Sequence, residues 1–164
     1  MNNIREEFKD CYNQYVRPIY RFVSLKVESD DIAKDIVSQT FMKGWDVFQA
    51  GEVKDARALL YRIARNLVID HYRQKQEAVS LDSVSLPDEN SVAKTAEINS
   101  DMDLVKKAIK NLNENYQNII IWRYIDELTL SEISCLTNKS ETATRVTLHR
   151  AMKALQQEIK RYEV

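Results

Sequence analysis

The sequence predicts an all-α protein made of two small helical domains joined by a flexible linker. The 164 residues include only 2 Gly and 2 Pro with 30% charged residues, and no segment shows the alternation of a strand. Apolar residues recur at spacings of three and four on both sides of residues 78–103, which break this pattern around Pro87. We therefore expect a first domain over 1–77, a flexible acidic linker over 78–100 and a second domain over 101–164.

The first domain is predicted to contain three helices, at about 3–26, 30–48 and 55–76. The second of them begins at "ESDDIAKD", where Ser29 or Asp30 can cap the helix and further acids favour its positive end. The apolar residues of this helix recur at core spacing, namely Ile32, Ile36, Val37, Phe41 and Trp45.

The second domain is predicted to end in a helix-turn-helix. Two helices come first, at about 101–112 and 114–125. Thr129 and Glu132 then form a capping box for a short helix, Asn138 suits the left-handed turn, and Ser140 caps a long helix. This long helix exposes the basic residues Arg145, His149, Arg150 and Lys153. Two helices joined by so short a turn are typical of DNA-binding proteins.

The stretch "ALLYRIARNLVIDHYRQK" (58–75) carries a strongly basic face. Its polar side holds Arg62, Arg65, Arg73 and Lys75 against one acid, Asp70, while Leu60, Ile63, Ala64, Leu67 and Val68 form a core stripe. One interpretation is a solvated cationic face whose long side chains cover apolar surface. The other is a nucleic-acid platform, with arginines on phosphates, Asn66 on a base edge, and Tyr61 and Tyr72 offering stacking faces. A second basic helix in the other domain favours the platform.

The net charge of −1 conceals an uneven distribution along the chain. Residues 1–77 carry 13 basic and 12 acidic residues, residues 78–103 carry 1 and 6, and residues 104–164 carry 10 and 7. An acidic connector therefore separates two mildly basic domains. Its simplest role is a solvated, self-repelling tether, although it could also shield a basic surface or imitate nucleic acid in a positive channel.

Features of enzymes and metal sites are missing from the sequence. Asp70 and His71 are neighbours, which point about 100° apart on a helix and cannot form a dyad. The chain has no Gly-rich phosphate loop and no "HExxH". Cys11 and Cys135 lie far apart, with no Cys or His at metal-ligand spacing. We expect no catalytic residues, no metal, no cofactor and two reduced cysteines.

The sequence also argues against a membrane location. No apolar run approaches the roughly 20 residues that span a bilayer. The N-terminal "MNNIREEFKD" is polar and has no apolar segment of the signal-peptide type. We expect a cytoplasmic protein without membrane insertion.

Three segments resemble the successive signatures of extracytoplasmic-function (ECF) sigma factors of the sigma-70 family. They are "DIAKDIVSQTFMKGW" (31–45), "ARALLYRIARNLVIDHYR" (56–73) and "LTLSEISCLTNKSETATRVTLHRAMKAL" (128–155), in family order over about 8–160. These sigma factors are the small, two-domain promoter-recognition subunits of bacterial RNA polymerase. The resemblance implies promoter recognition and strand opening at transcription initiation, a stress-response role, and three partners: core RNA polymerase, promoter DNA and an anti-sigma factor.

The resemblance also assigns residue roles. The helix that would dock on the clamp coiled coil of the largest polymerase subunit carries Asp35, Ser38, Gln39, Met42 and Lys43. The opened non-template strand at the minus-ten element would meet the loop 48–54 and Tyr61, Arg62, Arg65, Asn66, Ile69 and Arg73. The minus-thirty-five element would be read in the major groove by the helix that carries Ser140, Glu141, Thr142, Arg145, His149 and Arg150. The linker would thread toward the RNA exit path.

The chain departs from the family pattern at five positions. The chain has Leu59 where the family usually has Trp, Ala56 where an aromatic residue is common, and Gln39 where Glu is usual. It has Thr147 where Arg is frequent and Asn138 where Gly is usual. Two other functions remain open. A helix-turn-helix transcription regulator that works without polymerase would bind promoters tightly as the isolated chain and would need a dimerisation surface. A protein that only sequesters partners would not need Arg145 or Asn66.

Overall fold

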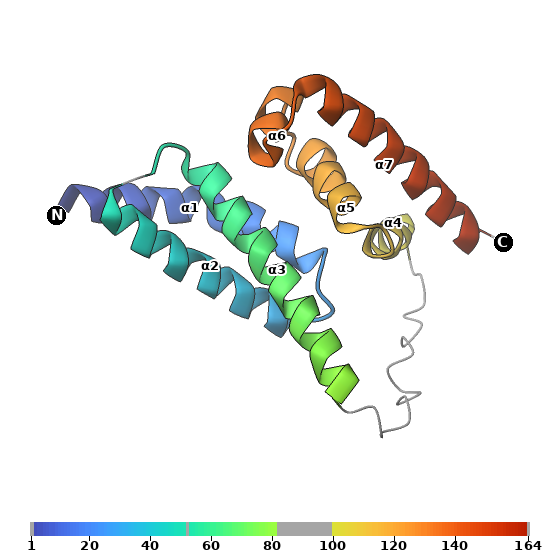
Figure 1. Ribbon diagram of the computed structural model, residues 1–164, viewed down its shortest axis with the longest axis horizontal. Coiled ribbons are helices and arrows are strands. Elements are labelled where there is room, and N and C mark those ends of the chain that lie inside the picture. Colours follow the sequence, from blue (N-terminus) through green and yellow to red (C-terminus); the bar gives the residue numbers. More distant parts are fainter. Residues whose placement is uncertain (1, 52, 82–99, 164) are drawn as a thin grey trace.

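In a computed structural model, which describes residues 2–51, 53–81 and 100–163, every regular element is a helix (Figure 1). The first domain consists of α1 (Asn2–Ser24), α2 (Asp30–Ala50) and α3 (Ala56–Leu81). The second consists of α4 (Asp101–Lys110), α5 (Glu114–Ile120), the π-helical turn η2 (Ile121–Ile125), α6 (Leu130–Thr137) and α7 (Glu141–Tyr162). The all-α prediction is confirmed. Of the predicted linker, residues 82–99 lie outside the described residues.

The three helices of the first domain pack around the apolar stripes that the sequence predicts. Ser29 is the N-cap of α2, and its side chain accepts a hydrogen bond from the Ile32 N–H. Leu60, Ala64, Leu67 and Val68 of α3 are buried, as are Ile36, Val37 and Phe41 of α2. Gly44 allows α2 and α3 to approach closely, because a Cβ there would lie 3.0 Å from the Leu60 Cδ2. Gly51 ends α2 with a positive φ of 78°, which glycine tolerates.

The helix-turn-helix of the second domain has the caps that the sequence predicts. Thr129 and Glu132 form the capping box of α6, and Asn138 ends this helix in the left-handed conformation with φ 53°. Ser140 caps α7 by accepting a hydrogen bond from the Ala143 N–H. The buried Ala151 and Leu155 anchor α7 in the domain core, so that its basic side faces outward.

Two helices differ from their predicted extents. The helix expected over 114–125 is α-helical only to Ile120, where a π turn begins in which the Asp126 N–H bonds to the Ile121 carbonyl at 2.9 Å. The π turn ends at Ile125, and two residues later Glu127 adopts a left-handed φ of 57°. The helix expected to stop near residue 76 continues to Leu81. The prediction placed the end of this helix where the more polar composition of the linker begins. The residues just after 76 include neither Gly nor Pro, so the helix continues through them.

The two domains contact each other directly through an aromatic cluster formed by Phe22, Tyr61 and Trp122. The rings of Phe22 and Trp122 lie parallel with centroids 5.6 Å apart, and Tyr61 meets each of them edge-on. Trp122 belongs to η2 and is 1% exposed, although its packing partners come from α1 and α3. The sequence left the relative placement of the domains open, and this cluster determines it.

Candidate nucleic-acid and partner interfaces

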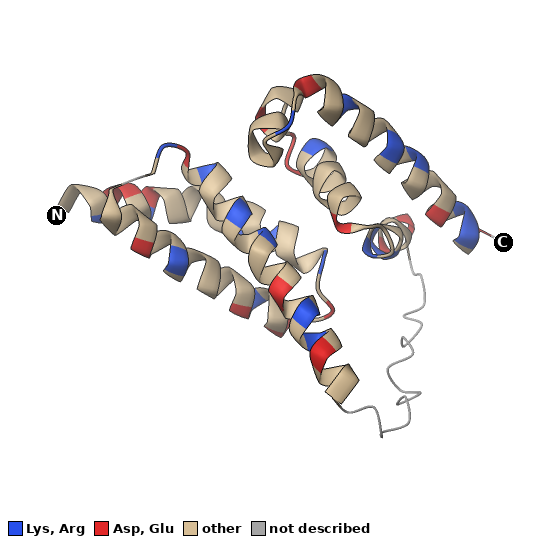
Figure 2. Ribbon diagram, viewed as in Figure 1, with Lys and Arg blue, Asp and Glu red and all other residues tan. Residues whose placement is uncertain are grey.

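The basic face of α3 presents most of the residues that the sequence assigns to an opened DNA strand. Arg62, Asn66 and Arg73 are exposed, and Arg65 and Ile69 are partly exposed. Lys and Arg residues recur along α3, as Figure 2 shows. The exposed side chains are one to two helical turns apart, which suits contacts to successive phosphates and bases of an extended strand.

The structure corrects the role that the sequence predicted for Tyr61. It was expected to offer a stacking face to a base, but its side chain is 2% exposed in this arrangement. Its hydroxyl donates a 2.5 Å hydrogen bond to Asp126, and burial together with the adjacent carboxylate raises its pKa. The reason is its place on the edge of the α3 core stripe, where η2 covers it. Tyr72 remains 39% exposed and donates a hydrogen bond to the Lys26 carbonyl.

The α7 helix presents all six residues that the sequence assigns to duplex reading. Ser140, Glu141, Thr142, Arg145, His149 and Arg150 are exposed. Arg145 lies 3.7 Å from Glu141, a loose contact between two exposed side chains that leaves the guanidinium available to DNA. Thr147, where the family often has Arg, instead donates its hydroxyl to the Ala143 carbonyl. The first turns of α7 therefore form a polar surface with one strong donor for a base edge.

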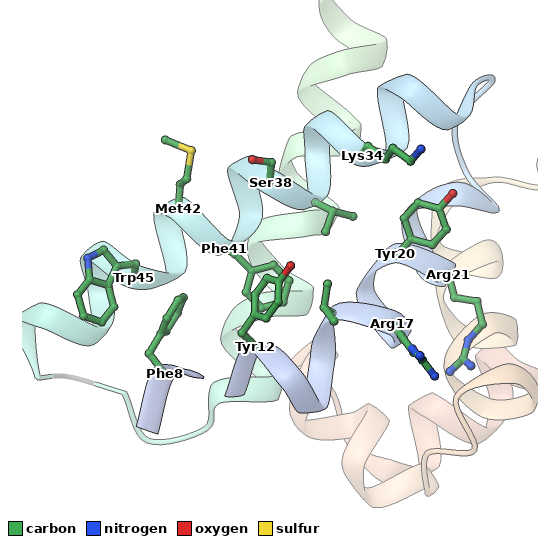
Figure 3. Close-up of a pocket in the computed structure, with 12 residues that line it drawn as sticks. Phe8, Tyr12, Arg17, Tyr20, Arg21, Lys34, Ser38, Phe41, Met42 and Trp45 are labelled. Carbon is green, nitrogen blue, oxygen red and sulfur yellow. The ribbon is translucent and has the colours of Figure 1, made fainter. Parts of the chain in front are cut away.

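The five residues assigned to polymerase docking lie on α2 but line two different hollows. Asp35, Gln39 and Lys43 line a hollow between α2 and α3, where the Gln39 amide donates a 2.8 Å hydrogen bond to Asp35. Ser38 and Met42 line a second hollow, between α1 and α2 (Figure 3). The sequence predicted one mixed polar face, whereas the structure divides it into a polar half and an apolar half.

The hollow between α1 and α2, here called the α1/α2 groove, is the larger and more apolar of the two. It has a volume of about 840 Å³, and Figure 3 shows aromatic side chains gathered in it. Phe8 lies 5.1 Å from Trp45, and Tyr12 lies 4.8 Å from Phe41, centroid to centroid. Met42 is 66% exposed at the groove, an unusual position for a large apolar side chain unless a partner covers it.

Sequence reasoning missed this groove because its residues come from two helices. Phe41 and Trp45 belong to the core stripe predicted for 30–48, and Phe8 and Tyr12 have the same spacing of four, which is ordinary for the buried side of a helix. Which members of a stripe stay exposed depends on how deeply the two helices pack against each other. That depth is a tertiary property.

No helix within the described ranges is both long and apolar enough to cross a membrane. Cys11 is buried and Cys135 is exposed, and both carry free thiols. Burial raises the pKa of the Cys11 thiol.

Comparison with known proteins connects these surfaces to a family. Sigma-70 region 2 matches residues 11–78, and sigma-70 region 4 matches residues 102–155. The chain is 26% identical to the ECF RNA polymerase sigma factor SigM of Bacillus subtilis, over 89% of this chain and 91% of SigM. It is 27% identical to the ECF RNA polymerase sigma factor BldN of Streptomyces coelicolor, over 92% of this chain, and spans 59% of the length of that relative.

The fold is similar to that of a solved sigma factor. The structure of RpoE from Bartonella quintana, solved in complex with the anti-sigma factor NepR, matches with a TM-score of 0.74 over 94% of this chain and 98% of RpoE, at 20% identity. Region 2 corresponds to the domain that carries the basic face of α3, and region 4 to the domain with the helix-turn-helix. The chain therefore belongs to the sigma-70 family, in the extracytoplasmic-function group of RNA polymerase sigma factors.

Proposed function

We propose that this chain directs RNA polymerase to promoters and takes part in opening the DNA strands, with its surfaces divided among three contacts. Core polymerase docks on α2 and the α1/α2 groove, the exposed face of α3 holds the minus-ten strand, and α7 reads the minus-thirty-five duplex. The observation that carries the proposal is the presence of two exposed basic helices and one exposed apolar groove in a single chain. In this proposal the protein acts in the cytoplasm, performs no catalysis itself and is held in reserve by an anti-sigma factor.

The exposed apolar groove favours a sigma factor over a regulator that works without polymerase. A regulator of that kind needs DNA contacts and a dimer interface, while a polymerase subunit needs a large protein-docking surface. Met42 and Tyr12, at 66% and 44% exposure, lie at the same groove and supply such a surface.

Transcription with core polymerase tests the proposed function. Core polymerase from the same organism is supplied with short genomic fragments, with and without this chain, and RNA 5′ ends are mapped. We expect a discrete set of start sites that appear only with the chain and share sequence elements upstream. If the 5′ ends are the same in both reactions, the chain does not direct initiation.

Variants of α2 test where polymerase docks. Reversing two charges with Asp35→Lys and Lys43→Glu should abolish co-elution with core polymerase. Met42→Lys should weaken it about tenfold, because it places a charge at the centre of an apolar contact. Leu81→Lys is the matched control, since Leu81 is also an exposed apolar residue, at 85%, but lies at the far end of α3. Equal binding by Met42→Lys and Leu81→Lys would exclude the groove.

The division of labour between α3 and α7 has its own test. Arg145→Ala should weaken recognition of the upstream duplex, where a good bidentate contact to a base contributes about 1–3 kcal/mol. Asn66→Ala should leave that contact intact and reduce strand opening, measured as lower permanganate reactivity of unpaired thymines. A template with a pre-opened bubble should then rescue Asn66→Ala but not Arg145→Ala. Rescue of both variants, or of neither, would contradict the division.

A further inference from the structure

A small polar hollow lies between α3 and the second domain, apart from the α1/α2 groove. It has a volume of about 80 Å³ and is lined by Arg65 of α3, by Trp122 of η2, and by residues of α5, α6, α7 and the turn between α6 and α7. Pockets for organic ligands usually hold about 300 Å³ or more. The hollow is therefore of a size for a compact ion and not for a nucleoside.

The hollow has an excess of positive charge. Its lining includes two cations, Arg65 and Lys139, which come from different domains, and no acid. Neither cation forms an ion pair with a carboxylate of the described residues. Burial is the main reason that the pKa of the nearby Lys26 falls to about 8, and the positive charge of Arg65 contributes to this fall while Glu114 opposes it. An anion in the hollow offsets the excess.

The hollow also borders a buried donor that lacks a partner. Trp122 is 1% exposed, and its indole Nε1–H is the one buried side-chain polar group of the described residues without a hydrogen bond. Such groups are rare in folded proteins, because the N–H gives up its bond to water and gains none in return. Since Trp122 lines the hollow, an oxyanion held there is placed to supply the missing acceptor.

Three threonine hydroxyls add acceptors to the lining. Thr137, Thr144 and Thr147 each donate the hydroxyl hydrogen to the helix carbonyl four residues earlier, at 2.9–3.0 Å. Their oxygens keep lone pairs and therefore accept hydrogen bonds. Inorganic phosphate carries a P–OH group at neutral pH that donates to such an oxygen, whereas sulfate carries no hydrogen. The lining therefore favours phosphate over sulfate.

We propose that this hollow is a binding site for one free phosphate ion, with Arg65, Lys139 and Trp122 as its donors. Arg65 and Lys139 hold the ion from opposite domains through charge-assisted hydrogen bonds, so bound phosphate adds a link between the domains. It also occupies Arg65, a residue that the proposed function gives to the opened DNA strand. The site itself is independent of that function, because binding of phosphate needs neither polymerase nor DNA.

The emission of Trp122 tests the site in the full-length chain. The chain has two tryptophans, so a Trp45→Phe background leaves Trp122 as the single emitter. We expect titration with sodium phosphate near neutral pH, with sodium chloride keeping the ionic strength constant, to shift this emission saturably at millimolar phosphate. A hollow that holds only water gives no such change. Unchanged Trp122 emission up to tens of millimolar phosphate would overturn the site.

Variants studied by calorimetry locate the bound ion. Arg65→Gln and Lys139→Gln should each weaken the Kd for phosphate about tenfold, the loss expected when one charge-assisted hydrogen bond is removed. Arg5→Gln and Lys153→Gln are matched controls, because they remove the same charge from exposed residues outside the hollow. Far-ultraviolet circular dichroism confirms that each variant stays folded. An equal loss in the controls would mean that phosphate responds to net charge alone, and would overturn the site.

Two further anions test the assignment to free phosphate. Sodium sulfate should bind more weakly than phosphate because it has no P–OH group. AMP should also bind more weakly, because the hollow does not admit its nucleoside. Sulfate that binds as tightly would indicate a general anion site, and AMP that binds as tightly would indicate an ester phosphate, so either result would overturn the assignment. Start-site mapping with polymerase is a separate measurement, so the phosphate site and the proposed function fail independently.

Discussion

Lys26 is a charged side chain buried at the meeting point of the two domains. It is 2% exposed, its ammonium lies 4.7 Å from the Phe22 ring centroid and 4.0 Å from the Glu114 carboxylate, and it donates to Asn118. Burial lowers its pKa to about 8, with Arg65 adding to the shift and Glu114 opposing it. A lysine in this setting connects domain packing to pH.

The contribution of Lys26 to the free energy of unfolding should therefore rise between about pH 8 and pH 10. Unfolded Lys26 keeps its proton up to its usual pKa of 10.5, while folded Lys26 releases it near 8, so the unfolded state binds more protons in this window. We expect a gain of about 1–2 kcal/mol, measured by urea unfolding at each pH. Lys26→Met is the control, because it keeps every other titrating group, including Cys11. Identical pH profiles for the two proteins would contradict the assignment.

At the scale of elements, the helix ends of the second domain are determined by single side chains. Ser140 accepts from the Ala143 N–H at 3.1 Å, and this bond positions the first turn of α7, which carries Glu141 and Thr142 of the proposed duplex contacts. Thr129 and Glu132 do the same for α6 through their capping box. Such caps act locally, which is why the sequence was sufficient to predict them.

Ser140→Ala should destabilise the chain by about 1 kcal/mol, because the Ala143 N–H loses its partner. Urea unfolding without DNA measures this effect apart from any contact of Ser140 with a promoter. Ser140→Asn should remain close to the parent, since Asn is an equally good cap. An equal loss in both variants would mean that Ser140 stabilises the chain in some other way.

At the scale of the whole molecule, the chain is two helical units held by a direct contact and joined by a predicted linker. The contact combines an aromatic cluster with paired charges, and interfaces of this kind within a chain commonly allow the domains to move. The linker prediction falls mostly on residues outside the described ranges, so it remains a prediction with a chemical test.

Trypsin supplies that test, because Lys94 is the one basic residue between Lys75 and Lys106. The composition of 78–100 offers little apolar surface to bury, so we expect the first cut after Lys94, followed by two resistant fragments. Mass spectrometry of an early time point identifies the site, and Lys94→Gln should delay the cleavage. A first cut within α3 or α7 would contradict the predicted domain boundaries.

The sequence by itself determined the features that depend on residues near one another in the chain. Helical periodicity predicted the elements, Ser29, Asn138 and Ser140 marked their ends, and three segments in order predicted the family. It also predicted which residues of α7 face outward, because the stripe around Leu155 fixes the opposite side. Local hydrogen bonding and helix geometry are sufficient for each of these predictions.

The tertiary structure decided the features that depend on contacts between segments far apart in the chain. The α1/α2 groove exists because Phe8 and Tyr12 of one helix stand opposite Phe41 and Trp45 of another. The burial of Tyr61 depends on Trp122, which lies 61 residues further along the chain and reaches it from the other domain. Burial is a property of packed pairs and not of single residues. For that reason the sequence indicated that α3 is suited to bind DNA, but not that the chain covers part of that helix itself.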